Sequence, residues 1–324
     1  MAEYRIVTVT LNPAIDRVVS VPQFRVGVHA KAKRVGWYPA GKGINVSRVL
    51  ATLGTRSIAT GLVGEGELAI FEEYLEHHGH ARVTTQLLSV RGRTRDNITV
   101  VDPVDDTETH LRDEGFTVQR EDMRRIMSKV GMLAREEAVV AFCGSLPPGA
   151  TTGDLRTMLH RCDEAGAHAV IDTSEQVLAD LRDEPVWMVK VNAKELETLT
   201  GMPTGSEQEA VEAARSILRS KGGSVEYVVA TRGADGAILL GPGVCLSAKV
   251  AVHPGLIANT VGCGDALLAG LLAAYVRGAD WDAALKRGVA TATANAVSRT
   301  PGVIEPDDIR QYAEMAILAP PTAA

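Results

Sequence analysis

The sequence has few cysteines, and their arrangement indicates neither a disulfide framework nor a zinc site. Its 324 residues include 4 cysteines and 8 histidines. Cys143, Cys162, Cys245 and Cys263 show no paired spacing with one another or with the histidines. The pattern argues against a structural zinc site and favours a reduced protein.

Long hydrophobic runs are also missing. The longest apolar stretch, 266–276, is far shorter than the roughly 20 residues that a membrane-spanning helix requires. The first residues, MAEYRIVTVTLNPA, lack the basic start and long apolar core of a secretory signal. We therefore expect no membrane partner and a cytoplasmic location.

An excess of positive charge is absent as well. The chain has 34 basic and 40 acidic residues, which give a net charge of −6, and no segment is dense in lysine or arginine. Nucleic acid is therefore not expected as a partner, nor is an anionic membrane surface. A small anionic ligand needs only a few local positive groups and is compatible with this composition.

Three common catalytic or nucleotide-binding motifs are missing. The chain has no GxxxxGK[ST] loop, no GxGxxG fingerprint after its first strand and no GxSxG elbow. These absences argue against a P-loop nucleotide site, a dinucleotide site and a Ser/His/Asp hydrolase. The chain does have 45% hydrophobic residues and enough length for one large α/β domain or two medium ones.

Short stretches rich in β-branched residues alternate with helical patterns, which indicates a parallel sheet covered by helices. The expected strands of this sheet are 5–11, 57–63, 138–143, 169–172, 187–191 and 227–231. Two regions contain strands without a helix between them: 17–21 with 31–37, and the hairpin of 97–102 and 107–112. We expect these two regions to form a small sheet that stands off the main domain.

A glycine-rich turn precedes an apolar helical pattern at 259–275, NTVGCGDALLAGLLAAY. Gly262 and Gly264 bracket Cys263, and Asp265 follows at once. A helix start of this kind has unpaired backbone N–H groups that attract anions. Asp265 has two interpretations: it caps a buried helix, or it handles a proton beside a transferring phosphoryl group.

A second glycine-to-helix start lies at 39–54, PAGKGINVSRVLATLG. Gly41 and Gly43 flank Lys42, and Asn45 follows on the expected helix. The same residues are compatible with a plain turn, a core helix and a solvated lysine. Two such starts in one chain favour a ligand with several oxygens or phosphates.

The polar candidates share one property, which is that they follow the ends of expected strands or begin the next helix. In open α/β sheets ligands bind outside the carboxyl ends of the strands, so we expect one site there. The candidates are Asp16, Lys42, Ser145, Asn192, Thr231 and Asp265. Arg93 and Arg95 are either surface charges or a place for a fixed phosphate.

Phosphoryl transfer to a hydroxyl needs an anion cradle, a base, tight positioning and a metal that neutralises phosphate charge. The two glycine turns can supply the cradle, and Asp265 the base. Asn192 and Glu195 can contact a hydrated magnesium ion directly or through its waters, since Mg²⁺ takes few protein ligands.

The glycine-rich turn at 259–265 resembles the signature of a known family. NTVGCGD is similar to the DTxGAGD signature of the ribokinase-like (PfkB) carbohydrate kinases. Five further segments resemble, in the same order, the branch that phosphorylates sugar phosphates. They are TLNPAID at 10–16, AGKGINVSRVL at 40–50, TR at 94–95, GSLPPG at 144–149 and NAKE at 192–195.

The resemblance covers essentially the whole chain. It implies a ribokinase-like, Rossmann-type three-layer α/β/α core with a small β-sheet lid. The expected organisation is a single kinase domain over 1–324, with lid segments at about 14–37 and 94–113. Because the lid makes many relatives dimers, the resemblance also raises a homodimer through the lid as one expectation.

The activity implied by the resemblance is ATP-dependent phosphorylation of a phosphorylated ketohexose, with ATP and Mg²⁺. The first expectation is conversion of fructose 1-phosphate to fructose 1,6-bisphosphate. Tagatose 6-phosphate and fructose 6-phosphate are alternative acceptors, because all three are small, anionic and rich in hydroxyl groups. A sugar-phosphate-binding sensor without catalysis is the alternative from another class.

The resemblance also implies roles for particular residues. Asp265 would be the base, and Gly262, Cys263 and Gly264 would offer backbone N–H groups to developing charge. The substrate-binding residues would be Asp16, Gly41, Lys42, Gly43, Asn45, Arg95, Asn97 and Ser145. Lys42 and Arg95 would meet the existing phosphate.

On the nucleotide side, the implied cofactor-binding residues are Lys190, Asn192, Glu195, Thr231, Gly233 and Gly236. Asn192 and Glu195 would lie near the metal. The chain departs from the family pattern at Cys263, where alanine is usual. It also departs at His110 and Arg112, where the branch often has Glu and Asn, so the sugar is left open.

Overall fold

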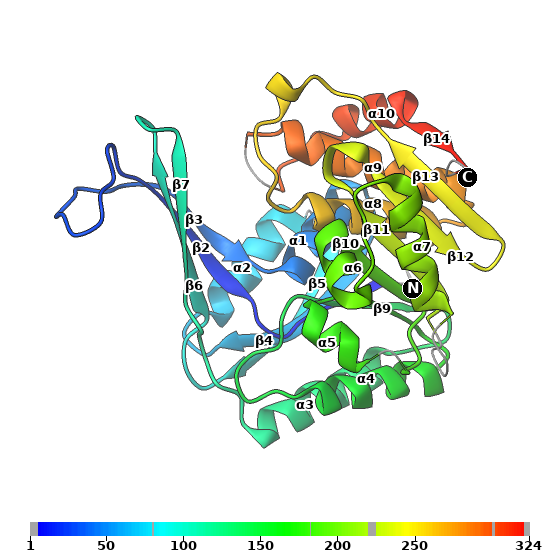
Figure 1. Cartoon of the computed structure of the whole chain (residues 1–324). Coiled ribbons are helices and arrows are strands. Elements are labelled where there is room, and N and C mark those ends of the chain that lie inside the picture. The colour runs from blue at the N-terminus through cyan, green and yellow to red at the C-terminus, as the bar shows by residue number, and fades with distance from the viewer. Residues whose placement is uncertain (1–5, 80, 182, 220–224, 300–301, 321–324) are drawn as a thin grey trace.

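Two sheets organise the chain, one large and central and one small and projecting (Figure 1). The structure is a computed structural model that describes residues 6–79, 81–181, 183–219, 225–299 and 302–320. Among these residues, no helix is both long enough and apolar enough to cross a membrane.

The large sheet has ten strands within the described residues, in the order β14-β13-β12-β11-β10-β9-β8-β1-β4-β5. They are β1 (Ile6–Thr10), β4 (Ser57–Gly64), β5 (Val83–Val90), β8 (Val139–Cys143), β9 (His168–Asp172), β10 (Met188–Asn192), β11 (Tyr227–Thr231), β12 (Ala237–Gly241), β13 (Val244–Lys249) and β14 (Ile317–Ala319). The seven strands from β5 to β11 in this order run parallel, and the last three pair antiparallel.

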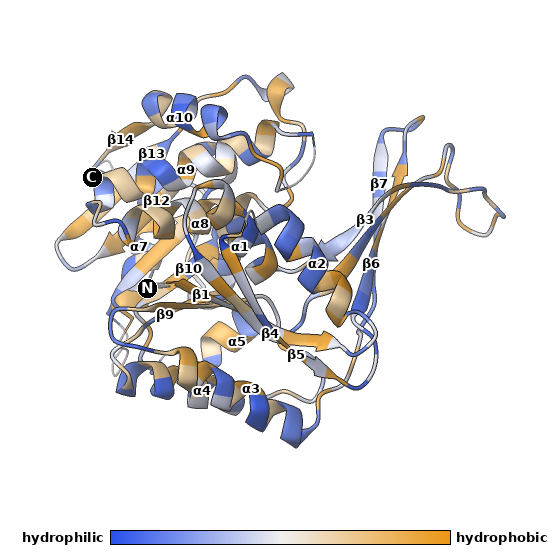
Figure 2. Cartoon of the chain, turned by 180° about the vertical axis from the view of Figure 1, so that it is seen from behind, coloured by the Kyte–Doolittle hydropathy of each residue, from blue (hydrophilic) through white to orange (hydrophobic). Residues whose placement is uncertain are grey.

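Helices cover both faces of the large sheet, so its central strands are buried and apolar (Figure 2). One layer contains α1 (Lys42–Thr52), α2 (Leu68–Gly79), α8 (Cys263–Tyr275), α9 (Trp281–Val297) and α10 (Pro306–Met315). The other layer contains α3 (Arg120–Leu133), α4 (Thr152–Glu164), α5 (Glu175–Asp180), α6 (Ala193–Thr200) and α7 (Glu207–Leu218). The expected three-layer α/β/α core is therefore present.

The position of β1 creates a crevice for a ligand. β1 pairs with β4 on one side and with β8 on the other, and all three strands are parallel. The chain goes from β1 through α1 to β4, whereas β8 and the strands beyond it build the opposite half of the sheet. Crevices at such a switch in strand order are where open α/β sheets bind ligands.

The small sheet combines the two regions that interrupted the regular alternation of strands and helices. Its order is β3-β2-β6-β7, formed by β2 (Ala14–Ser20), β3 (Lys33–Ala40), β6 (Arg95–Asp102) and β7 (Thr107–Arg112). β2 pairs antiparallel with β3 and parallel with β6. The sequence-based expectation of a small sheet built from segments far apart in the chain is confirmed, and Figure 1 shows this sheet projecting from the core.

Most expected elements are present within one to three residues of their expected ends, but two strands of the large sheet were not expected. β5 follows α2 and pairs parallel with β4 at one edge. β14 is three residues long and pairs with β13 at the opposite edge. Both are edge strands.

Candidate active site

The first turn of α8 contains Asp265 in an unusual position. Gly262 is the residue that precedes the helix, and its φ of 74° is in the left-handed region that favours glycine. The helix begins at Cys263, so Asp265 lies inside the first turn, and the helix start has no side-chain cap. The N-cap interpretation of Asp265 is therefore wrong.

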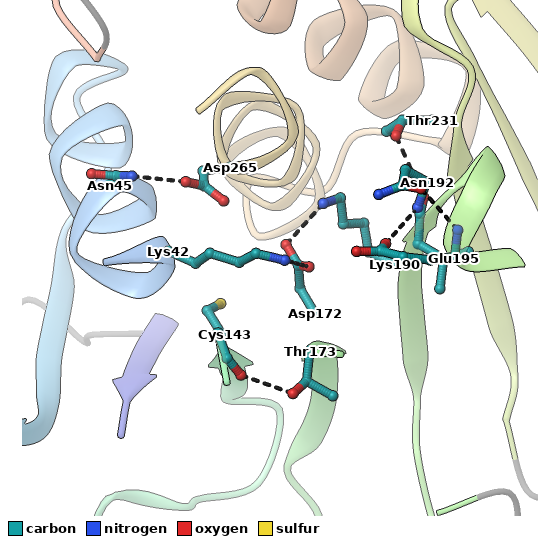
Figure 3. Close-up of polar contacts among 12 residues, drawn as sticks. Lys42, Asn45, Cys143, Asp172, Thr173, Lys190, Asn192, Glu195, Thr231 and Asp265 are labelled. Carbon is teal, nitrogen blue, oxygen red and sulfur yellow. Dashed lines mark hydrogen bonds and ion pairs between the residues drawn. The ribbon is translucent and has the colours of Figure 1, made fainter. Parts of the chain in front are cut away.

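The Asp265 carboxylate is instead directed to a neighbouring helix. Its side chain is buried, and its Oδ2 accepts a hydrogen bond from Nδ2 of Asn45 on α1, at 2.8 Å (Figure 3). Burial raises the pKa of Asp265 to about 6, and the nearby negative charge of Asp172 adds to this rise. Lys190, Asn45 and Lys42 act in the opposite direction. The result is a carboxylate suited to accept a proton near neutral pH.

The turn before Asp265 is shaped to leave backbone N–H groups available. Ala266 donates its N–H to Gly262 O at 2.8 Å, which closes the first helical turn. The N–H groups of Gly264 and Asp265 donate to no carbonyl among the described residues. Asn295 of α9 steadies the turn, because its Nδ2 donates to Val261 O at 2.8 Å and contacts Cys263 Sγ at 3.3 Å. Such a turn can hold an anion.

Gly264 also allows a lysine to approach the turn. A Cβ built at Gly264 would lie 2.6 Å from Nζ of Lys190, which is a buried residue of β10. The lysine amine therefore lies against the same backbone that presents the free N–H groups. The positive charge of Lys190 and the free backbone N–H groups therefore lie together at the start of α8.

Asp172, at the carboxyl end of β9, joins the two lysines of the site. Its Oδ1 accepts from Nζ of Lys42 at 2.6 Å, and its Oδ2 accepts from Nζ of Lys190 at 2.9 Å (Figure 3). Burial opposes ionisation of Asp172, but the two lysines outweigh it and hold the pKa of Asp172 below its ordinary value. Burial likewise opposes the charge of Lys42, yet Asp172 raises the pKa of Lys42.

Asp172 was missed by the sequence reasoning, although a signal for it was present. It is the polar residue that ends an apolar strand, HAVID, in the same way as the candidates at the ends of other strands. The partner of Lys42 lies 130 residues away in the chain. No local pattern encodes that pairing.

Asp16 and Asn97 face each other across the small sheet. They are register partners on β2 and β6, and Asn97 Nδ2 donates to Asp16 Oδ1 at 2.9 Å. Burial raises the pKa of Asp16, against smaller lowering effects from Asn97, Arg95 and Arg112. Oδ1 of Asn97 is buried and has no hydrogen-bond partner, which suits a hydroxyl donor from a ligand.

Arg95, at the start of β6, lies beside this pair. Its Nε and Nη2 donate to the carbonyls of Pro13 and Asn12, at 3.2 and 3.1 Å. Burial lowers the pKa of Arg95, and Arg112 adds to the effect. Asn12 in turn donates from Nδ2 to Oγ of Ser145, at 3.1 Å. These contacts bring the ends of β1 and β8 together with the small sheet.

Gly41 and Gly43 permit α1 to start directly against β1. A Cβ at Gly43 would lie 2.3 Å from Oγ1 of Thr10, and one at Gly41, where φ is 141°, would lie 2.9 Å from Thr10 Cγ2. This close approach positions Lys42 and Asn45 over the carboxyl end of the sheet.

Asn192 and Glu195 form a reciprocal capping box at the start of α6. Oδ1 of Asn192 accepts from the N–H of Glu195 at 2.9 Å, and Oε2 of Glu195 accepts from the N–H of Asn192 at 2.8 Å. The other carboxylate oxygen of Glu195 has no hydrogen bond within the described part of the chain. No cluster of three or more His, Cys, Asp or Glu side chains suited to a metal occurs among those residues.

The remaining candidates lie beyond the next strand. Thr231 ends β11, its Oγ1 reaches Val191 O at 3.5 Å, and Figure 3 places it beside Asn192. Gly233 and Gly236 begin and follow a short 3₁₀ turn, with φ of 60° and 82°. A Cβ at Gly236 would lie 2.0 Å from Ala248 O. Thr231 is the register partner of Asn192 on the neighbouring strand.

The sequence-based candidates thus form two connected groups. Asn45 holds Asp265, and Asp172 links Lys42 with Lys190, whose amine lies against Gly264 in the same turn as Asp265. Asp16, Asn97, Arg95 and Ser145 are linked through the small sheet and Asn12. Between them, a buried base, unpaired N–H donors and cationic side chains can act on an anionic ligand with hydroxyl groups.

Comparisons with known proteins identify relatives along most of the chain. The chain is 32% identical over 274 residues to a 1-phosphofructokinase of Haemophilus influenzae, with 84% of this chain and 85% of that one covered. It is 30% identical over 300 residues to a 1-phosphofructokinase of Bacillus subtilis, with 93% and 95% covered.

Among solved structures, phosphofructokinase-2 of Escherichia coli in complex with substrates and products has a TM-score of 0.87 at 24% identity. The match covers 96% of this chain and 99% of that one, and it supports the ribokinase-like fold. Residues 7–308 match the pfkB family carbohydrate kinase domain. The chain belongs to the PfkB family of carbohydrate kinases.

Proposed function

We propose that this chain transfers the γ-phosphoryl group of ATP to fructose 1-phosphate, giving fructose 1,6-bisphosphate and ADP. The observation that carries the proposal is Asp265, a buried carboxylate with a pKa of about 6 beside unpaired helix N–H groups and two lysines. Relatives named 1-phosphofructokinase at about 30% identity support the choice of acceptor.

Asp265 would act as the general base. The acceptor hydroxyl oxygen forms a bond to the γ-phosphorus, the bond between this phosphorus and the ADP oxygen breaks, and the hydroxyl proton passes to the Asp265 carboxylate. Asn45 holds one oxygen of the carboxylate at 2.8 Å and so fixes its orientation. The N–H groups of Gly264 and Asp265, with Lys190 against Gly264, would stabilise charge on the transferring group, whereas the Cys263 N–H already donates to Thr260 O at 3.5 Å.

Residues of the small sheet would bind the sugar. Asp16 and the orphaned Oδ1 of Asn97 offer acceptors to its hydroxyl groups. Arg95 would meet the existing phosphate, together with Lys42. Gly41, Gly43 and Ser145 would complete the substrate side, while Thr231, Gly233 and Gly236 would border ATP.

Magnesium is the metal that a kinase of this family implies. Asn192 and Glu195 fit a hydrated Mg²⁺ ion, because one Glu195 oxygen is left over by the capping box and Mg²⁺ needs few protein ligands. These two residues would hold the ion directly or through water. When bound, Mg²⁺ neutralises phosphate charge.

We also propose that the small sheet acts as a lid, within a single domain, and pairs with the lid of a second copy. Cross-strand partners in a sheet point to the same face. Tyr38, Asp16, Asn97 and Arg112 form one row across all four strands. Its polar side chains would face the sugar.

The neighbouring row, on the opposite face, contains Trp37, Arg17, Ile98 and Leu111. Trp37 is 38% exposed and Leu111 52% exposed. A second copy of this chain would cover such an apolar face.

The test is an assay of ADP release with fructose 1-phosphate, fructose 6-phosphate, tagatose 6-phosphate and fructose. We expect the highest kcat/KM with fructose 1-phosphate. Asp265→Asn should lower kcat by roughly 10²-fold or more while sugar-phosphate binding persists, because the base is lost and the shape is kept. Asp282→Asn is the matched control, since Asp282 is an exposed carboxylate in the first turn of α9.

Turnover of fructose without turnover of any phosphorylated sugar would overturn the acceptor class. A wild-type rate in Asp265→Asn would exclude Asp265 as the base. Binding of fructose 1-phosphate without turnover in the wild-type protein would instead identify a sensor.

A further inference from the structure

A cavity of about 460 Å³ lies between α1, α2 and β3, at the base of the small sheet. Its walls include three aromatic residues, Trp37, Tyr38 and Tyr74, and one buried cation, Arg48. Of its lining residues, Tyr38 also belongs to the row of the small sheet that would face the sugar, and the others have no role in the reaction proposed above. A volume of this size is in the range that binds small molecules.

Arg48 is the unusual member of this lining. It is only 6% exposed, and its Nη2 donates to the carbonyl of Gly302 at 3.3 Å. Its guanidinium carbon lies 4.9 Å from the centre of the Tyr74 ring, a cation–π contact. Nε of Arg48 is buried and has no hydrogen-bond partner. Within the described residues no carboxylate forms an ion pair with it.

A buried cation with unpaired donors is costly, because it has lost water without gaining a counter-ion. The lining does contain a carboxylate, that of Glu73, but Glu73 is exposed and forms no ion pair with Arg48. The positive charge of Arg48 therefore affects the neighbouring tyrosine hydroxyl groups. Burial raises the pKa of both Tyr38 and Tyr74, and Arg48 opposes that rise at each hydroxyl.

These groups define the chemistry of a ligand. A guanidinium group pairs best with oxyanions, through charge-assisted hydrogen bonds. Two phenol hydroxyl groups near the same charge add donors, which suits the several oxygens of a phosphate group. The rings of Trp37 and Tyr74 offer flat apolar surface beside it.

We propose that this cavity is a second ligand site, which binds a phosphate group through the guanidinium group of Arg48. The ligand is either the free phosphate ion or the phosphate of a small organic molecule whose body lies against the aromatic walls. The site does not depend on the proposed reaction, because Arg48 and Tyr74 have no part in that reaction.

Trp37 provides a direct test. The chain has 3 tryptophans, and the other two, Trp187 and Trp281, lie in an aromatic cluster with their ring centres 5.8 Å apart. Titration of the wild-type protein with inorganic phosphate should give a saturable change in tryptophan fluorescence that is lost in Trp37→Phe. A titration with phenyl phosphate separates the two sources of the ligand. Tighter binding than phosphate identifies an organic phosphate, and equal binding identifies the free ion.

Two variants separate this cavity from the proposed sugar site. Arg48→Lys keeps a positive charge but removes the planar guanidinium group and its several donors, so it should weaken binding by about tenfold or more. Arg95→Gln, in the sugar site, should leave the Trp37 signal unchanged. Tyr74→Phe keeps the ring under the guanidinium and removes only a hydroxyl, so it gives a milder loss if Arg48→Lys does not fold.

The proposal is overturned if neither probe gives a saturable signal with the wild-type protein. It is also overturned if Arg95→Gln abolishes the signal while Arg48→Lys and Tyr74→Phe retain it, since the phosphate would then lie in the sugar site.

Discussion

Asp265 is a buried carboxylate that would act as a base. A base must be ionised, whereas burial opposes ionisation. Its pKa of about 6 results from burial and from Asp172, offset by Lys190, Asn45 and Lys42. A base acts in its ionised form, so kcat/KM should be constant above this pKa and fall as the pH drops through about 6. A profile of kcat/KM against pH checks this expectation.

Asn45 provides a sharper test of the same residue. Its hydrogen bond favours the ionised form of Asp265, so Asn45→Ala should raise the pKa and move the acidic limb of the profile to higher pH. The plateau should also fall by about tenfold, because the carboxylate loses its orientation. Asn97→Ala is the control: its partner is Asp16, so the limb should stay near pH 6 while KM for the sugar rises. A limb that stays in place in Asn45→Ala would contradict the role of this hydrogen bond.

Arg95 allows the phosphate of the acceptor to be tested apart from the sugar ring. Arg95→Gln should raise KM for fructose 1-phosphate on the order of tenfold and leave KM for ATP nearly unchanged, because a charge-assisted contact is lost. Arg93→Gln is the matched control, since Arg93 is largely exposed and pairs with Glu67 at 3.6 Å. Equal increases in both KM values would place Arg95 elsewhere.

At the scale of elements, two glycines of α8, Gly264 and Gly270, are expected to have different roles, one catalytic and one structural. Gly264→Ala would put a methyl group 2.6 Å from the flexible end of Lys190. The lysine can move, so we expect little loss of stability but a fall in kcat on the order of 10²-fold, as the anion cradle changes. Thermal unfolding and steady-state kinetics on the same variant measure both.

Gly270→Ala, on the same helix, should show the reverse pattern. Its new Cβ would meet Thr291 Oγ1 at 2.5 Å and the Arg287 carbonyl at 2.7 Å, both on α9. Backbone cannot yield as a side-chain end does, so we expect a loss of about 1–3 kcal/mol in the free energy of unfolding. A stable, inactive Gly270→Ala protein would contradict this distinction.

Local sequence patterns predicted the strands whose own residues are mostly β-branched or apolar, as expected for buried strands. IVTVT and VVAFC consist of β-branched and apolar residues, and they are buried throughout because helices cover both faces of their strands. β5, VTTQLLSV, is an edge strand with many half-buried residues, so its pattern is weak. The three-residue β14 depends on pairing with β13, which no local pattern reveals.

The site residues could also be predicted only in part, because contacts between distant segments leave no local sequence pattern. The sequence shows that polar residues end neighbouring strands, and this holds for Asn192 and Thr231. Asp16 instead lies inside β2 of the small sheet. The hydrogen bond from Asn45 to Asp265 spans 220 residues. It decides that Asp265 is a held carboxylate and not a helix cap. Contacts of this kind follow only from the packing of α1 against α8.

At the scale of the whole molecule, the small sheet has two faces with different chemistry. Asp16 and Asn97 lie on one face, and Trp37 and Leu111 on the other, because successive residues of a strand alternate between faces. An exposed apolar face on a projecting sheet is best buried by an identical face, which gives a symmetric dimer. The proposed dimer through the lid therefore makes a prediction for single residues of β7.

Leu111→Asp should convert the dimer to a monomer, because a charge on the apolar face would be buried without a partner. His110→Asp is the matched control, since His110 is the adjacent residue of the same strand, is also exposed and points to the opposite face. Light scattering after size-exclusion chromatography measures the mass of each variant, and circular dichroism checks that both fold. A wild-type monomer, or a dimer that survives in Leu111→Asp but not in His110→Asp, would show that the apolar face is not the interface.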